Sequence, residues 1–284
     1  MVITMKIGVS SYSFRKHIAA TGISYTDLCN VAKSMGFDGI EFVELENYDK
    51  VTDPMKNAKY IGEHCREIGL EVIAYTVGAS FTEEDFGPQL EKLKRQIDIA
   101  AEMGALVLRH DVCYKLPEGM SWEEAVELMV PRIREVTEYA ESKGIRTCTE
   151  NHGYIFQAPD RVEKLIKAVD HKNYGWLCDM GNFLCADADP LESVKIAAPY
   201  TFHAHAKDFL YKSAEVNRPK GFFRTVGENH LRGTVLGHGV VPVDQCVKVL
   251  KDAGYDGWLS IEFEGMEENI PALEAGLEYL RSVI

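Results

Sequence analysis

The stretch MGFDGIEF, residues 35–42, joins the end of a helical pattern to the start of a strand pattern. In the segment before it, Tyr25 to Ser34, apolar side chains recur three and four positions apart among polar ones, which is the period of an amphipathic helix. Gly36 suits the left-handed backbone conformation that closes a helix, and the run after it suits a buried strand. The stretch therefore predicts a helix, a glycine cap and a strand in succession.

The same junction recurs in IGLEVIAY (68–75), MGALVLRH (103–110), KGIRTCTE (143–150) and AGYDGWLS (253–260). With further strands predicted at Lys6 to Ser10, Tyr174 to Asp179 and Thr201 to Ala206, eight strands alternate with eight helices. Such alternation indicates a parallel sheet covered by helices, and eight units in 284 residues favour a closed α/β (β/α)8 TIM barrel. An open doubly wound sheet usually has a glycine-rich phosphate loop after its first strand, and VSSYSFRK (9–16) lacks that pattern.

No linker, charge block or low-complexity stretch divides the chain, so residues 1–284 are expected to form a single TIM-barrel domain. The longest irregular part is expected at about 209–241, after the seventh strand. A segment of that length can serve as a functional loop or lid.

The charge of the chain restricts its partners. The 31 Lys and Arg residues are outnumbered by 44 Asp and Glu residues, and the net charge of -13 repels polyanions, which argues against a nucleic-acid partner. The seven scattered cysteines, without C-x-x-C spacing, are typical of reduced and mostly buried thiols. The N-terminal stretch MVITMKIGVS has no long apolar core, so neither a signal peptide nor a membrane partner is expected, and we predict a cytoplasmic protein.

Potential metal ligands stand at the ends of the last four barrel strands, which read TENHG, CDMGN, HAHAKD and SIEFE. In a TIM barrel the carboxyl ends of the strands form the active-site face, so Glu150, Asp179, His205 and Glu262 are expected to converge there. A single carboxylate at a strand end is more often a helix cap or an ion-pair partner, and it is the joint placement that points to a metal. Three carboxylates and one imidazole suit one divalent ion, with Mn²⁺, Mg²⁺ or Co²⁺ favoured and Zn²⁺ also compatible.

The stretch FHAHAKDF, residues 202–209, places two histidines on one face of the seventh strand. His205 lies nearer the rim and is the expected ligand, whereas His203 lies about 7 Å deeper and is expected to pack in the interior and form a hydrogen bond there, with support of the ligand as a further role. Glu264 shares a face with Glu262 and is the alternative ligand. Glu41, at the second strand, is expected either to contact substrate or to have a structural role.

The succession TENHG, CDMGNF, HAHAKDF, LGHGVV and GYDGWLSIEFE resembles the xylose isomerase-like TIM-barrel superfamily of sugar isomerases and epimerases. The resemblance implies that Glu150, Asp179, His205 and Glu262 hold the metal. It also implies that the catalytic residues Glu150 and Glu262 exchange protons with the carbon next to a ketone. The sequence departs from the family at Asn182, where many relatives have histidine, and at Tyr211, where the epimerases have arginine.

Five side chains near the strand ends are predicted to bind substrate. They are Lys207, which offers a positive charge to a substrate oxygen, and His152, Asn182, His110 and Tyr12. For His152 a surface position without function is an equal alternative. For His110 the alternative is an approach to a second metal, and Arg109 beside it is expected to be an ion-pair partner.

The resulting hypothesis is a divalent-metal-dependent sugar isomerase or epimerase, acting on a ketose or keto-polyol by proton abstraction through a metal-bound enediolate. The runner-up is a metal-dependent dehydratase or lyase acting on a keto-sugar, a keto-inositol or a dehydroshikimate-like substrate, because it would share the first proton abstraction. An endonuclease IV-like phosphodiesterase is disfavoured by the negative charge, and a non-catalytic sugar-binding subunit is a further alternative. The small-molecule partner is a sugar or polyol, and the resemblance implies a homo-oligomer.

Overall fold

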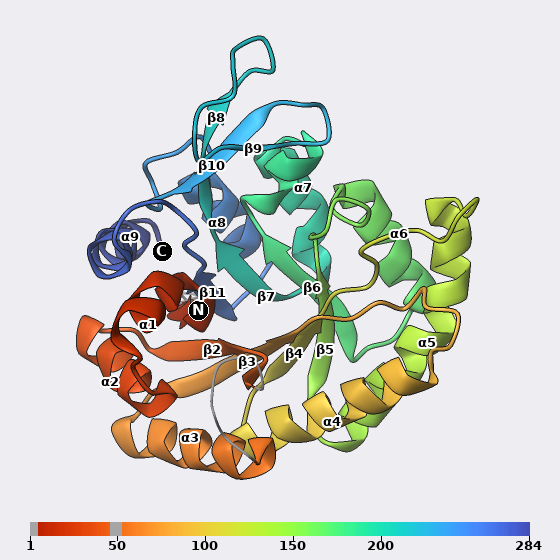
Figure 1. The fold of residues 1–284 in the computed structure, drawn as a ribbon, viewed down its shortest axis with the longest axis horizontal. Helices are drawn as coiled ribbons and strands as arrows, with labels where there is room; N and C mark the ends of the chain where they lie inside the picture. Colours follow the sequence, from red (N-terminus) through yellow and green to blue (C-terminus); the bar gives the residue numbers. More distant parts are fainter. Residues whose placement is uncertain (1–4, 46–52) are drawn as a thin grey trace.

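Eight parallel strands close into a barrel in the computed structural model, which describes residues 5–45 and 53–284 (Figure 1). Their order around the barrel is β1-β11-β7-β6-β5-β4-β3-β2, so that the first and last strands in the chain pair with each other. The barrel strands are β1 (Lys6–Ser10), β2 (Gly39–Val43), β3 (Glu71–Val77), β4 (Val107–His110), β5 (Arg146–Glu150), β6 (Tyr174–Asp179), β7 (Thr201–Ala206) and β11 (Trp258–Ile261). The predicted TIM barrel is confirmed.

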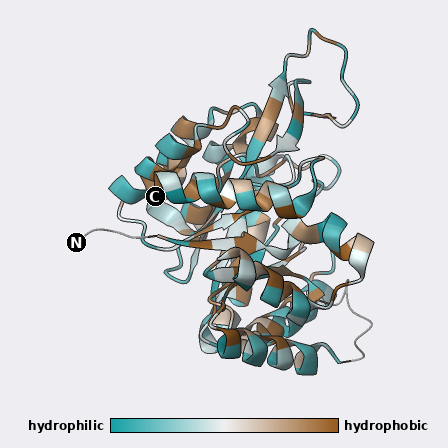
Figure 2. Ribbon diagram, turned by 90° about the vertical axis from the view of Figure 1, so that its left-hand side faces the viewer, coloured by the Kyte–Doolittle hydropathy of each residue, from teal (hydrophilic) through white to brown (hydrophobic). Residues whose placement is uncertain are grey.

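Eight helices surround the barrel in alternation with its strands, as predicted, and the helix expected at Tyr25 to Ser34 ends one residue later, at Met35. They are α2 (Tyr25–Met35), α3 (Pro54–Ile68), α4 (Gly87–Met103), α5 (Trp122–Ser142), α6 (Pro159–Val169), α7 (Pro190–Ala197), α8 (Val243–Asp252) and α9 (Asn269–Val283). Figure 2 shows that these helices mix hydrophilic and hydrophobic residues along their length, as amphipathic helices do.

One further helix, α1 (Arg15–Thr21), lies between β1 and α2 and was not predicted. None of its residues is buried, so it lacks the apolar stripe that reveals a helix in a sequence.

The glycine junctions have the backbone conformation that the sequence predicted. The backbone φ angle is positive at Gly36, Gly69, Gly104, Gly144 and Gly254, where a side chain would strain the chain.

On strands β4, β5 and β6 the barrel interior is apolar below the active-site face. Val107, Cys148 and Leu177 pack together there, with Phe202 against them. Each of the first three stands two residues before Arg109, Glu150 or Asp179, so the same inward face of each strand is apolar below and ionisable above. A separate, larger cluster fills the layer between strands and helices.

The segment after β7 is more ordered than predicted. Instead of an irregular loop over 209–241, the chain forms a three-stranded antiparallel sheet of β8 (Asp208–Lys212), β10 (His230–Thr234) and β9 (Phe223–Arg224). Figures 1 and 2 show this sheet projecting from the barrel. It begins two residues after β7 and therefore stands at the rim of the barrel.

The pairing of β6 with β7 contains a register shift. Trp176 pairs with Thr201, but the next residue, Leu177, pairs with His203 instead of Phe202. From there the ladder continues in step, so that Asp179 pairs with His205. Phe202 packs against the inner cluster, and the following residue His203 also faces inward, toward Glu41. The extra residue is the mark of a β-bulge.

Three further observations bear on the expectations from the sequence. All seven cysteines are buried. Across residues 5–45 and 53–284, no helix is both long enough and apolar enough to span a bilayer. The stretch in which no signal peptide is expected begins with residues 1–4, which lie outside the described residues.

Candidate functional site

Four ionisable side chains converge at the carboxyl ends of the last barrel strands. Glu150 ends β5, Asp179 ends β6, His205 lies near the end of β7, and Glu262 follows β11. One ligand atom from each can be chosen so that all four lie within 4.8 Å of one another. The first three side chains are almost fully buried, and the Glu262 side chain is 14% exposed. The structure thus brings together the four residues that the sequence predicted as a set.

His205 Nδ1 lies at the centre of this group. It is 3.5 Å from Asp179 Oδ2 and 3.6 Å from both Glu150 Oε1 and Glu262 Oε2. Within the described part of the chain, neither His205 Nδ1 nor Asp179 Oδ2 makes a well-aligned hydrogen bond, although Lys207 Nζ forms an ion pair with that oxygen at 3.1 Å. Because buried polar atoms are nearly always satisfied, these two atoms call for a further partner at this point.

A divalent cation fits that requirement. Ligand atoms that share one ion at the usual bond lengths of about 2.0–2.2 Å lie about 3.0–3.6 Å apart, close to the separations around His205 Nδ1. Carboxylates and imidazole are ligands for Mn²⁺, Mg²⁺, Co²⁺ and Zn²⁺ alike. The residues present therefore match a divalent metal centre and leave the identity of the ion open.

Two buried cations balance the carboxylates. Arg109 Nη2 lies 2.6 Å from Glu150 Oε2, and although burial would raise the pKa of Glu150, Arg109 and His205 together lower it to about 2. Lys207 Nζ lies 2.5 Å from Glu262 Oε2 and 3.1 Å from Asp179 Oδ2. Burial opposes the charge on Lys207, but Asp179 and Glu262 raise its pKa well above the usual value. Both cations thus stay charged beside the metal-ligand candidates.

A chain of ion pairs leads from Glu150 to the surface. Arg109 also binds Asp111 through two hydrogen bonds of 2.8 and 3.0 Å, and Asp111 Oδ1 lies 2.8 Å from His152 Nδ1. Burial alone would lower the pKa of His152, but the Asp111 carboxylate raises it. Sequence reasoning did not single out Asp111. Its signal was the spacing in LRHD, which places Arg109 and Asp111 two positions apart at a strand end.

Two hollows open beside the four candidate ligands. One, of about 160 Å³, is lined by Tyr12, Arg109, Glu150 and Glu262 among others. The other, of about 270 Å³, is lined by residues that include Asn182 and Phe223, and the two share His152, Lys207 and Glu264. The predicted substrate-binding residues Tyr12, His152 and Lys207 therefore face a space that can admit a small molecule.

Asn182 lies between the candidate ligands. Its side-chain nitrogen donates to Glu150 Oε1 at 2.8 Å, and its side-chain oxygen accepts from Lys207 at 3.1 Å. Its backbone N–H donates to Asp179 Oδ1 at 2.8 Å. Both ends of the amide are therefore already hydrogen-bonded. Asn182 connects Glu150 to Lys207, and its amide is not free to bind a ligand in the hollow.

His110 does not lie where the sequence predicted. Neighbouring side chains on a strand point to opposite faces, and since Arg109 points into the barrel, His110 points outward. Its ring packs against Phe81 and Tyr174, with centroid separations of 4.9 and 5.9 Å, and its Nδ1 lies 3.0 Å from the Asp111 carbonyl oxygen. The prediction that His110 binds substrate or a second metal is therefore corrected to a place in the layer between strands and helices.

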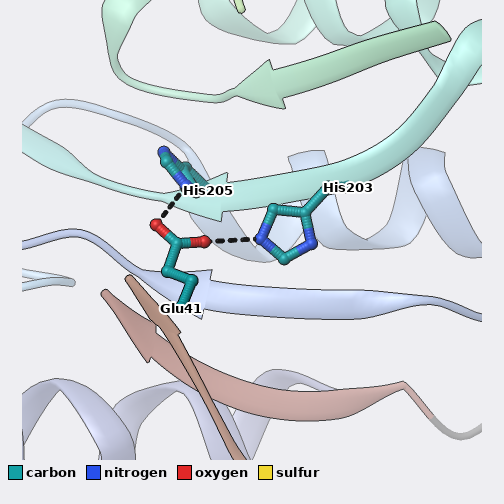
Figure 3. Close-up of side chains that lie close together, drawn as sticks. All are labelled: Glu41, His203 and His205. Carbon is teal, nitrogen blue, oxygen red and sulfur yellow. Dashed lines mark hydrogen bonds and ion pairs between the residues drawn. The ribbon is translucent and has the colours of Figure 1, made fainter. Parts of the chain in front are cut away.

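His203 stands two residues before His205 on β7, and the Glu41 carboxylate lies between the two rings (Figure 3). The predicted hydrogen bond of His203 exists, and its partner is Glu41. Glu264 is not within the group of four, and one of its oxygens lies 3.9 Å from Lys207 Nζ. Burial raises the pKa of Glu264.

Comparison with known proteins shows the family and the fold of the chain. A family model described as xylose isomerase-like TIM barrel matches residues 29–283. Inosose dehydratase of Bacillus anthracis is 28% identical over 160 residues, which are 55% of this chain and 52% of that protein, so the chain spans about half the length of this relative. Among solved structures, the probable 3-DHS dehydratase AsbF from Bacillus anthracis matches with a TM-score of 0.76 at 22% identity, over 98% of this chain and 99% of that one. D-psicose 3-epimerase from Clostridium cellulolyticum H10, solved with D-tagatose, matches with a TM-score of 0.73 at 16% identity, over 98% and 99%.

Proposed function

Because the chain belongs to the xylose isomerase-like TIM-barrel family, we propose that it is a metal-dependent enzyme that moves a proton at the carbon next to the carbonyl of a sugar or polyol. The observation that carries the proposal is the convergence of three carboxylates on the unpaired Nδ1 of His205. Glu150, Asp179, His205 and Glu262 would hold the ion. A divalent cation at this place supplies Lewis acidity toward the substrate carbonyl.

Glu150 and Glu262 are the proposed proton-transfer groups. Both line the hollow of about 160 Å³, so both carboxylates are within reach of a small molecule there. Arg109 holds one oxygen of Glu150 and Lys207 holds one oxygen of Glu262, which fixes the orientation of each carboxylate. A fixed carboxylate beside the substrate is the arrangement that general acid–base catalysis requires. Isomerisation or epimerisation returns the proton to the neighbouring carbon or to the opposite face.

A dehydratase is the second candidate, and the pair of His152 and Asp111 favours it. His152 lines both hollows, and Asp111 holds its Nδ1 at 2.8 Å and favours the protonated ring. A protonated imidazole at that position could donate its proton to a departing hydroxyl group once the first proton has been removed. The inosose dehydratase and probable 3-DHS dehydratase among the similar proteins support this alternative.

The test is an incubation of the purified protein in D₂O with a panel of ketoses, a keto-inositol and 3-dehydroshikimate, after removal of metal and reloading with Mn²⁺, Mg²⁺, Co²⁺ or Zn²⁺. An isomerase or epimerase would produce a sugar with one deuterium on carbon, and a dehydratase would produce a product that has lost water. Glu262→Gln and Glu150→Gln should lose the activity, whereas the matched change Glu278→Gln, at an exposed position of α9, should keep it. Absence of both deuterium uptake and dehydration with every metal and substrate would refute the proposal.

A further inference from the structure

Glu41 connects the two histidines of β7 from the other side of the barrel (Figure 3). Its Oε2 lies 2.7 Å from His203 Nε2, and its Oε1 lies 2.9 Å from His205 Nε2. All three side chains are only 1% exposed. The contact with His203 is a well-formed hydrogen bond, and the contact with His205 is an ion-pair contact in which the N–H direction is less well aligned. Each carboxylate oxygen of Glu41 therefore contacts one imidazole ring.

The two ring nitrogens of His205 face different groups. Nδ1 faces Glu150, Asp179 and Glu262 at 3.5–3.6 Å, and Nε2 faces Glu41 at 2.9 Å. Glu41, His203 and His205 could themselves be read as a metal site because their ligand atoms cluster. Contacts of 2.7 and 2.9 Å are, however, hydrogen-bond distances that leave no room for an ion between the atoms. The two clusters thus have different roles, although they share one imidazole.

A neutral imidazole carries its proton on one nitrogen and offers a lone pair on the other. A carboxylate beside Nε2 stabilises the form with the proton on Nε2, which leaves the lone pair on Nδ1. That lone pair is directed at the three carboxylates of the candidate metal centre. Metal-binding histidines commonly have their second nitrogen held in this way by a carboxylate.

We propose that Glu41 is a positioning residue that keeps the proton of His205 on Nε2, so that Nδ1 is the metal ligand, and that His203 holds Glu41 in place. The inference rests on the metal centre of the proposed function and extends it to residues on β2 and deeper in the barrel. Glu41 itself touches neither the hollows nor the four candidate ligands other than His205. Its effect must therefore pass through the imidazole.

The first test reads the proton position directly in the wild-type protein. Long-range ¹H–¹⁵N correlation spectra of protein labelled with ¹⁵N-histidine, loaded with diamagnetic Zn²⁺ or Mg²⁺, should show His205 with a proton on Nε2 and none on Nδ1. The signal is assigned by its loss in His205→Asn. A proton on Nδ1 in the metal-loaded protein would overturn the proposal, and this measurement does not depend on any variant of Glu41 being folded.

The second test measures Mn²⁺ affinity by calorimetry for Glu41→Gln. Glutamine keeps the size of the side chain, but its amide can either donate or accept and so no longer fixes the tautomer. The expected result is a weakening of about 10- to 100-fold, the usual cost of losing such a partner. Glu44→Gln is the matched control, because Glu44 follows the same strand but pairs with Lys92 on the outside, and it should bind Mn²⁺ as the wild type does.

The outcomes separate this inference from the proposed function. If wild-type protein binds no divalent ion, the metal centre and the role of Glu41 both fail. If the wild type binds Mn²⁺ and folded Glu41→Gln binds it equally well, only the role of Glu41 fails. A loss of affinity with an unchanged His205 tautomer would also overturn the proposal, because Glu41 would then act on the fold and not on the imidazole.

Discussion

Lys207 Nζ lies 2.5 Å from Glu262 Oε2, the oxygen that also faces His205 Nδ1. The same ammonium lies 3.1 Å from Asp179 Oδ2, another of the four ligand candidates. The buried ammonium of Lys207 thus contacts the same two carboxylate oxygens that would bind a divalent ion. The arrangement makes Lys207 both a competitor of the metal and a positive charge at the mouth of the site.

Replacing this lysine should separate metal binding from catalysis. Lys207→Met removes the competing charge, so we expect Mn²⁺ to bind at least severalfold more tightly. If Lys207 binds a substrate oxygen as proposed, turnover should fall at the same time, because that oxygen loses its cation. Calorimetry and kcat measure the two effects. Lys248→Met, at an exposed position on α8, is the control and should change neither. Weaker metal binding in Lys207→Met would contradict this account.

Metal removal should lower thermal stability. An ion that binds the folded protein alone stabilises it by about 2.7 kcal/mol at a free concentration of 100 times Kd. For a chain of this size we expect the midpoint of unfolding to rise by roughly 5–10 °C when Mn²⁺ is added to chelator-treated protein. Glu262→Gln should lose most of this rise. A rise of the same size in the variant would place the bound ion elsewhere.

Arg109 should be needed for folding stability as well as for the site. It is the buried partner of both Asp111 and Glu150, so Arg109→Met leaves two buried carboxylates without their cation. Loss of one partner of such a group costs about 3–5 kcal/mol in the free energy of unfolding. Urea unfolding measures the loss. The exposed pair of Lys248 and Asp252 provides the comparison, since breaking it in Lys248→Met should cost no more than about 1 kcal/mol.

His110 should make the protein sensitive to mild acid. Burial lowers the pKa of this imidazole from 6.5 to about 4, so the folded protein keeps it neutral. The unfolded chain takes up a proton below pH 6.5, which means that this contribution to stability is complete above that pH and is lost between about pH 6.5 and 4. The expected loss is on the order of 3 kcal/mol. His110→Phe, which suits the aromatic surroundings, should flatten the pH dependence of urea unfolding in that window, and an unchanged slope would contradict the assignment.

The barrel and the ligand set could be predicted because both depend on simple periodic patterns. Helical spacing, a glycine cap and a short apolar run recur at each unit, and the carboxyl ends of parallel strands meet on one face. Glu150, Asp179 and Glu262 end or follow their strands, so the order of strands was enough to bring them together.

Other features depend on contacts that a pattern does not contain. Arg109 and His110 are neighbours on one short strand, so only one of them can point into the barrel. The structure shows that it is Arg109, but the sequence was equally compatible with His110 pointing inward. The pairing of Arg109 with Asp111, and of Glu41 with both histidines, joins strands whose relative register the sequence does not state. The small sheet after β7 was missed because its strands are interrupted by long turns and leave the barrel.

The bulge in β7 determines which residues can meet at the metal centre. Phe202 and His203 both face inward, so the alternation restarts at His203 and carries His205 inward as well. With an ideal ladder, Asp179 would pair with Ala204, and the imidazole of His205 would turn toward the helices. A redesign that straightened this strand could therefore retain every candidate ligand in the sequence and still abolish the metal centre. The one extra residue of the bulge decides which side chains of β7 point into the barrel.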